Sequence, residues 1–204
     1  MTFKSIRGVF KSYEQLLITL ENLERKHSTL LVAVDGCGGS GKSTMAIALA
    51  KLSSDVTVIH MDDFYLPSNQ RTSGTAIENP VGDDFDWLRL KAQVLEQLAN
   101  NKKSKYQIYN WPSDILVEWS IVPPGGIVIV EGVYSTRREL ADFYDYKIYV
   151  DCSREFRLER GIQRDGELAR DMWENNWMVA EDKYIKEHNP SEHAELVISS
   201  SGNT

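Results

Sequence analysis

Short runs of apolar residues alternate along the chain with segments whose apolar residues recur at helical spacing. The continuous runs predict strands buried on both faces, as in a parallel sheet. They lie at 30–34, 56–61, 127–132, 147–151 and 196–198. Helices are predicted at 12–26, 44–52, 87–100, 153–170 and 171–187. The alternation of strand and helix predicts an α/β protein whose central parallel sheet is flanked by helices.

The same pattern predicts the domain organisation of the chain. We expect one domain over residues 1–204, in which 1–27 form a helical extension and 199–204 a frayed tail. Ser12 and Gln15 resemble a capping box at the start of the predicted helix 12–26. In the helix at 87–100, four residues are expected to pack on the sheet, namely Leu88, Val94, Leu95 and Leu98.

Composition excludes several classes of protein. The 204 residues carry a net charge of −7, which argues against a general binder of nucleic acids or anionic membranes. Two cysteines and no apolar leader favour a reducing cytoplasm. The four histidines lack zinc-ligand spacing, and a homo-oligomer is left open.

The segment 36–44 fits the phosphate-loop (Walker A) pattern G-x-x-x-x-G-K-[ST] between a predicted strand and a predicted helix. Its glycines allow backbone amides to curl around phosphates, Lys42 reaches the β- and γ-phosphates of ATP, and the Ser43 hydroxyl goes to Mg²⁺. The alternative is a glycine-rich turn without a nucleotide. The candidate cofactor-binding residues are Gly36, Gly38, Gly39, Ser40, Gly41, Lys42, Ser43 and Thr44.

Acidic residues follow two predicted strands, at the sheet edge where ligands gather in such folds. A carboxylate of the pair Asp62-Asp63 is placed to accept a proton from an attacking hydroxyl, although Asp63 could instead cap a helix. Glu131 stands where phosphate-loop proteins keep an acid for the metal shell.

Three polar segments are candidates for gripping a substrate. In the loop 66–85, Asp83 and Asp84 could accept hydroxyl groups, or the loop is merely solvated and Asp86 caps the next helix. The aromatic segment 106–114 could wall a planar ring, or belong to the core. The arginine-rich segment from 153 could be a catalytic lid, about 153–176, or a surface helix with ion pairs.

From about residue 28 to 200, the order of these motifs resembles the uridine kinase group of P-loop kinases, which includes phosphoribulokinase, pantothenate kinase and nicotinamide riboside kinase relatives. The segment 61–65 is similar to the family motif that places the base on Asp62, and 82–86 to the one that binds ribose hydroxyls through Asp83. Residues 131–132 resemble the family's Glu-Gly, and 157–165 its arginine lid, with Gly161 in place of one arginine. Gly161 and Gly166 are expected to serve as hinges.

The resemblance implies a Mg-ATP-dependent kinase acting on a primary hydroxyl of a small molecule, with the 5′-hydroxyl of uridine or cytidine as the first expectation. The segment 109–114 departs from the family and has no nearby histidine, which keeps nicotinamide riboside and pantothenate open as acceptors. A nucleotide-dependent regulator is the alternative from another class. The implied residues are Asp62, Lys42, Arg160 and Arg164 for catalysis, Asp83, Tyr65 and Tyr109 for the substrate, and Ser43, Glu131 and Asp62 for the metal.

Overall fold

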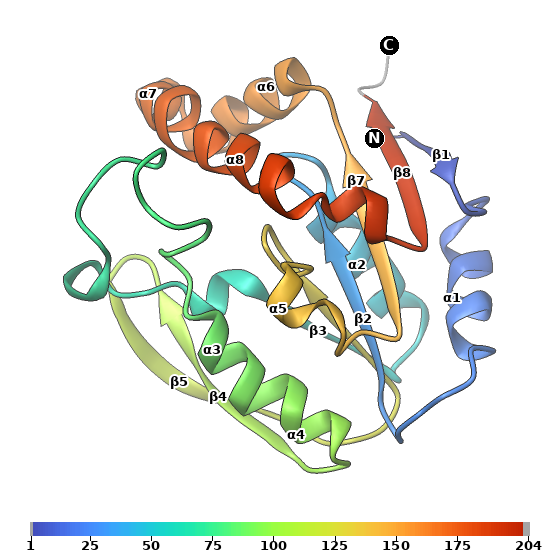
Figure 1. The fold of residues 1–204 in the computed structure, drawn as a ribbon. Helices are drawn as coiled ribbons and strands as arrows, with labels where there is room; N and C mark the ends of the chain where they lie inside the picture. The colour runs from blue at the N-terminus through green and yellow to red at the C-terminus, as the bar shows by residue number, and fades with distance from the viewer. Residues whose placement is uncertain (1, 202–204) are drawn as a thin grey trace.

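The computed structural model describes residues 2–201, and within them the main sheet has six strands in the order β1-β8-β7-β2-β6-β3 (Figure 1). Strand β1 runs antiparallel to β8, and the other neighbouring pairs are parallel. The strands are β1 (Thr2–Arg7), β2 (Leu30–Asp35), β3 (Val56–His60), β6 (Ile127–Glu131), β7 (Tyr146–Asp151) and β8 (Leu196–Ser201).

Helices cover both faces of this sheet, so the predicted α/β class is confirmed (Figure 1). They are α1 (Tyr13–Glu21), α2 (Lys42–Leu52), α3 (Trp87–Leu90), α4 (Glu96–Ala99), α5 (Arg138–Ala141), α6 (Arg154–Asp165), α7 (Arg170–Met172) and α8 (Met178–His188). One π-helical segment, Lys91–Leu95, joins α3 to α4, and another, Trp173–Trp177, joins α7 to α8.

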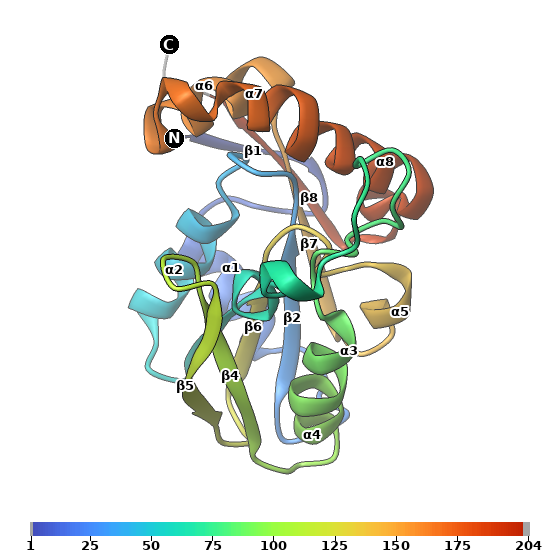
Figure 2. The ribbon, with the colours of Figure 1, turned by 90° about the vertical axis from the view of Figure 1, so that its left-hand side faces the viewer.

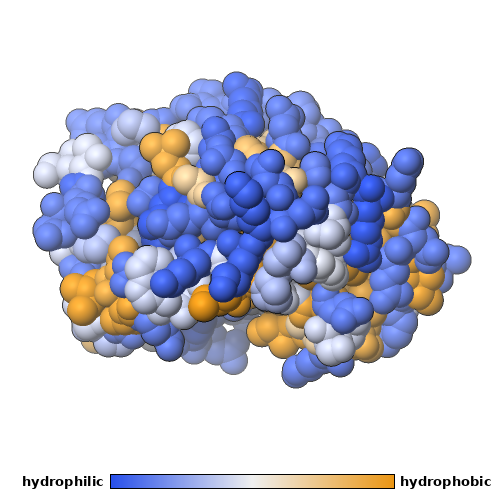
Figure 3. Space-filling model, turned by 90° about the horizontal axis from the view of Figure 1, so that it is seen from below, coloured by the Kyte–Doolittle hydropathy of each residue, from blue (hydrophilic) through white to orange (hydrophobic). Residues whose placement is uncertain are grey.

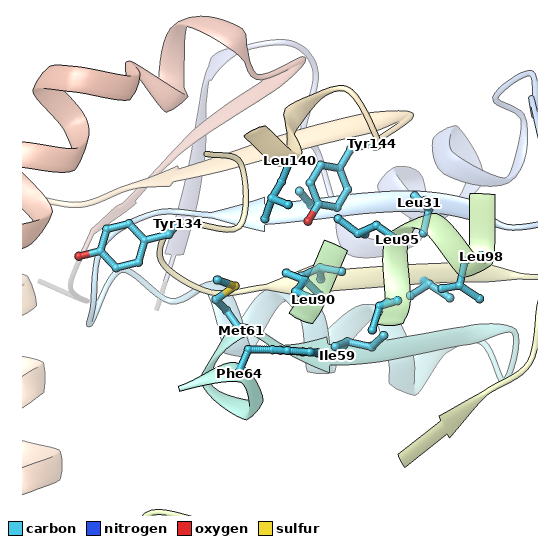
Figure 4. Close-up of a cluster of buried hydrophobic side chains, with 14 of the residues drawn as sticks. Leu31, Ile59, Met61, Phe64, Leu90, Leu95, Leu98, Tyr134, Leu140 and Tyr144 are labelled. Carbon is cyan, nitrogen blue, oxygen red and sulfur yellow. The ribbon is translucent and has the colours of Figure 1, made fainter. Parts of the chain in front are cut away.

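The apolar strands alternate their side chains between two cores. In β2, Leu30, Val32 and Val34 face the core formed with α1 and α2, whereas Leu31 and Ala33 face the core formed with α3 and α4. Figure 4 shows the second core, in which residues of the sheet meet leucines of α3, α4 and the π-helical segment between them. Each fully buried large apolar side chain contributes about 1.5–3 kcal/mol, so both faces of β2 hold the sheet in register.

The prediction of a helical extension over 1–27 is partly wrong. Residues 2–7 form strand β1 at the sheet edge, and only α1 is helical. Ser12 is its N-cap, as predicted, and accepts a hydrogen bond from the backbone amide of Gln15 at 3.2 Å. The last strand is longer than predicted, because residues 199–201 pair with β1; the rest of the predicted tail lies outside the described residues.

The aromatic stretch and the segment after it form a hairpin that the sequence reading missed. Strands β4 (Ser104–Asn110) and β5 (Ile115–Val122) form a separate two-stranded sheet, beside the main one in Figure 2. The prediction for Leu88 is also wrong, since it is 59% exposed whereas Leu90 is buried. The π-helical turn that follows α3 shifts the helix face by part of a turn relative to a regular α-helix.

One face of the surface can be followed in Figure 3. Seen from below the view of Figure 1, it is mostly hydrophilic, and its hydrophobic side chains form separate groups (Figure 3). No helix within residues 2–201 has both the length and the apolar character needed to cross a membrane.

Candidate active site

The phosphate loop begins where central strand β2 ends, and α2 starts at Lys42. Gly36 has a φ of 141°, and a Cβ there would lie 2.3 Å from the carbonyl oxygen of Val150, so only glycine fits. The Lys42 ammonium donates to the carbonyl of Cys37 at 3.0 Å. Loop amides, the N-terminus of α2 and an ammonium group therefore meet at one point, which is an anion-binding arrangement.

Helix α8 braces this loop from the side. The hydroxyl of Tyr184 donates to Asp35 at 2.6 Å, and Asp35 in turn accepts the amide of Gly36 at 2.6 Å. One turn earlier on α8, Glu181 accepts the amide of Gly38 at 2.6 Å. The first half of the loop is thus fixed by protein contacts, and the second half faces the cleft.

Glu131 lies at the carboxyl end of β6, beside the start of α2. Its Oε2 accepts the hydroxyl of Ser43 at 3.1 Å, and its Oε1 is 2.5 Å from Nδ1 of His60. Burial opposes ionisation of Glu131, but the hydrogen bond from His60 and the charge of Lys42 keep its pKa below the usual value. The same bond raises the pKa of His60.

The two acidic residues after β3 differ in their surroundings. Asp62 opens into the cleft, where the surrounding protein and the charge of Glu131 raise its pKa. Asp63 instead accepts the hydroxyl of Tyr106 at 3.2 Å on the hairpin. Asp62 is therefore the carboxylate that a bound molecule can reach.

The cleft has a volume of about 990 Å³ and runs from the phosphate loop to the segment 71–85. At the far end, Asp83 and Asp84 line it, and the hydroxyl of Tyr65 donates to Asp84 at 3.1 Å. Desolvation raises the pKa of Asp83. These carboxylates can accept hydroxyl groups of a molecule bound in the cleft.

Tyr109 lies behind the cleft wall rather than in it. It is 4% exposed, and its hydroxyl donates to Asp114 at 2.7 Å. Trp111 takes the place at the cleft surface, with its ring 4.4 Å from that of Tyr65. The guanidinium of Arg71 lies 4.4 Å from the Tyr65 ring centre. The wall is aromatic, as predicted, but the exposed ring belongs to a different residue.

The arginines of α6 differ in their exposure and in their hydrogen-bond partners. Arg157 is buried and donates to Glu181 at 2.7 Å. Arg160 lines the cleft but donates to the carbonyl of Gly39 at 3.0 Å and to Ser200 at 3.1 Å. Arg164 is largely exposed, pairs with Asp165 at 2.8 Å, and lies near enough to Asp62 to act on its charge.

Gly161 is not the hinge that the sequence suggested. It lies inside α6, where the ring of Trp173 fills the space in front of it. The same ring lies against Gly38 of the phosphate loop. Gly166, by contrast, ends α6 with a φ of 87°.

One cleft therefore brings together most of the predicted residues: Gly38, Gly39, Gly41, Lys42, Ser43, Thr44, Asp62, Tyr65, Asp83, Glu131, Arg160 and Arg164 line it. Gly36, Ser40 and Tyr109 support its walls from behind. The sequence reading missed Glu181 and Trp173, because neither belongs to a local motif.

The fold and this loop define a P-loop protein of the α/β class. Residues 31–171, more than half of the chain, match the family model described as Phosphoribulokinase / Uridine kinase family. The chain belongs to this family.

Individual relatives agree with this assignment. The chain is 31% identical to a uridine kinase of Saccharomyces cerevisiae over 66% of its own length and 28% of that protein. It is 29% identical to a phosphoribulokinase of Synechocystis sp. over 67% of its length and 42% of that protein. The chain thus matches less than half of each of these longer relatives.

A solved structure supports the fold. A protein described as a possible uridine kinase from Bacillus stearothermophilus superposes with a TM-score of 0.73 at 24% identity, covering 91% of this chain and 96% of that one.

Proposed function

We propose that the protein is an ATP-dependent kinase that transfers the γ-phosphoryl group to a primary hydroxyl of a small molecule. We further propose a pyrimidine nucleoside, uridine or cytidine, as the acceptor through its 5′-hydroxyl. The observation that carries the proposal is the position of Asp62, which opens into one cleft together with Lys42 and Asp83. Family membership supports the same reaction class.

In the proposed reaction, the acceptor oxygen attacks the γ-phosphorus and its proton passes to the carboxylate of Asp62. The bond from the γ-phosphorus to the bridging oxygen breaks, and ADP leaves. Lys42 and the loop amides hold the phosphates, and Arg164 is placed to balance charge on the transferring group. Asp83 accepts hydroxyl groups of the acceptor and so fixes its position.

The donor set near the loop fits Mg²⁺ bound as a nucleotide complex. Ser43 and Glu131 offer one hydroxyl and one buried carboxylate, with Asp62 close by. Within residues 2–201, no cluster of three acidic, histidine or cysteine side chains forms a metal cage of its own. Mg²⁺ commonly uses one or two carboxylates together with phosphates, and when bound it neutralises phosphate charge.

The experiment is an ADP-release assay with Mg-ATP and a panel of uridine, cytidine, nicotinamide riboside and pantothenate. Release stimulated by uridine or cytidine supports the full proposal. Stimulation only by nicotinamide riboside or pantothenate keeps the kinase and replaces the acceptor. Slow hydrolysis that no acceptor stimulates points to a nucleotide-dependent regulator.

The residue at the centre of the proposal has its own test. Asp62→Asn should abolish turnover and leave binding of a fluorescent ATP analogue nearly intact, because only the proton acceptor is removed. Full activity of this variant, or loss of ATP binding, would remove Asp62 from the role of base.

A further inference from the structure

The partner of Glu131 on the neighbouring strand is a residue that the proposed mechanism does not use. Strands β3 and β6 are parallel, and their register places His60 directly opposite Glu131. Nδ1 of His60 lies 2.5 Å from Oε1 of Glu131, while Oε2 of the same carboxylate accepts the hydroxyl of Ser43. The sheet itself therefore fixes which way the carboxylate points.

The two residues differ in exposure. The side chain of Glu131 is 6% exposed, whereas that of His60 is 45% exposed. A half-exposed imidazole adds little to the core, so packing alone does not account for its contact with a buried carboxylate. Hydrogen bonds from outside the ligand set commonly orient the carboxylates that bind metals.

We propose that His60 is a positioning residue for the metal–nucleotide site. Its hydrogen bond holds Oε1 of Glu131, so that Oε2 stays turned toward Ser43 and the phosphate loop. This inference rests on the proposed function, since it assumes that Ser43 and Glu131 serve a Mg-nucleotide complex. The competing interpretation is that the bond only satisfies a buried acid and has no effect on the metal.

Two substitutions at position 60 separate these interpretations. His60→Asn keeps an N–H donor on the atom bonded to Cγ, where Nδ1 stands in histidine. His60→Leu removes the donor and keeps the bulk. Thr57→Val is the matched control, because Thr57 lies on the same strand and pairs with Val128, away from Glu131.

The readout is binding of a fluorescent ATP analogue to the full chain, titrated with Mg²⁺ and repeated in EDTA. We expect His60→Leu to raise the Mg²⁺ concentration for half-maximal binding by about 10–100-fold. His60→Asn and Thr57→Val should stay close to the wild type. Binding in EDTA should be the same for all four proteins. It serves as the control for folding, since a substitution that disturbed the fold in general would lower it.

The outcomes distinguish failure of this inference from failure of the proposed function. Wild-type protein that does not bind the analogue, or binds it equally with and without Mg²⁺, would overturn the proposed metal–nucleotide site itself. Normal Mg²⁺ dependence in the wild type with an unchanged His60→Leu variant would overturn only the role of His60. An Asn variant as impaired as the Leu variant would also overturn it.

Discussion

Replacing Gly161 by alanine tests how tightly α6 is docked on the phosphate loop. A Cβ there would lie 2.4 Å from Cε2 and 2.5 Å from Cζ2 of Trp173, and both distances are much shorter than an ordinary contact of 3.4–4 Å. Trp173 is 2% exposed, so its ring cannot move without disturbing its neighbours. Overpacking of this kind costs about 1–3 kcal/mol. The higher helix propensity of alanine offsets about 1 kcal/mol.

We therefore expect Gly161→Ala to lower the free energy of unfolding by about 0–2 kcal/mol. A double-mutant cycle with Trp173→Leu isolates the clash. In that background the ring is gone, and alanine at 161 should stabilise the protein by about 1 kcal/mol.

The assay is urea unfolding followed by far-ultraviolet circular dichroism, which does not depend on the tryptophan that is removed. The coupling energy should be about 1–3 kcal/mol. Because the ring also contacts Gly38, Gly161→Ala should weaken binding of the ATP analogue as well. Additive effects of the two substitutions, or a wild-type background stabilised by Gly161→Ala, would refute the close packing.

Three further predictions concern charged groups. Arg157→Met should cost about 3–5 kcal/mol in urea unfolding at pH 8, because it leaves the buried carboxylate of Glu181 without its charge partner. The loss should shrink as the pH is lowered, since burial raises the pKa of Glu181 and protonation removes the unpaired charge. With the acceptor found in the panel, the acidic limb of kcat/KM should have its midpoint above 3.8, because desolvation raises the pKa of Asp62, the proposed base. A midpoint below that value contradicts the assignment. Asp114→Asn should speed proteolysis in the loop 66–85 without changing the Tm, since Asp114 holds Ser68 at the start of that loop. Hydrogen bonds lower the pKa of Asp114 to about 2, so the protection that it gives this loop against proteolysis is fully present above the unfolded pKa and is lost as the pH falls through about 2.

The parts of the site that the sequence predicted are those encoded locally. The phosphate loop is contiguous, so spacing alone places Lys42 and Ser43 at the start of a helix. Asp62 and Glu131 come from different strands, but both follow apolar runs, and parallel strands bring their carboxyl ends to one edge. Local pattern and a single topological rule placed Glu131 and the pair Asp62-Asp63 at this edge, and the family resemblance chose Asp62 from the pair.

Contacts between distant segments could not be predicted in this way. Glu181 meets Gly38 across 143 residues, and neither hydrophobic spacing nor a motif links them. Strand β1 is short and mixed in polarity, and its conformation depends on the free edge of β8. The second strand of the hairpin could have been predicted, because Ile115–Val122 is largely apolar. In the structure it follows a turn in which Asp114 has a φ of 54°.

The structure also narrows which part of the arginine segment can close over a substrate. Arg157 and Arg160 hold the first turns of α6 against α8 and the phosphate loop, and Gly161 packs on the ring of Trp173. Beyond them, Arg164 is 66% exposed and Leu168 fully exposed, and Gly166 has space around it among the described residues.

A lid that moved as one body over 153–176 would have to break the buried pair between Arg157 and Glu181, which also holds the amide of Gly38. Movement confined to residues 162–172 leaves that pair intact and breaks the hydrogen bond from the indole N–H of Trp173 to Asp165 at 2.9 Å. Arg164 is then the arginine that can approach a transferring phosphoryl group without disturbing the loop that holds it. The first half of the segment serves as a fixed wall of the cleft.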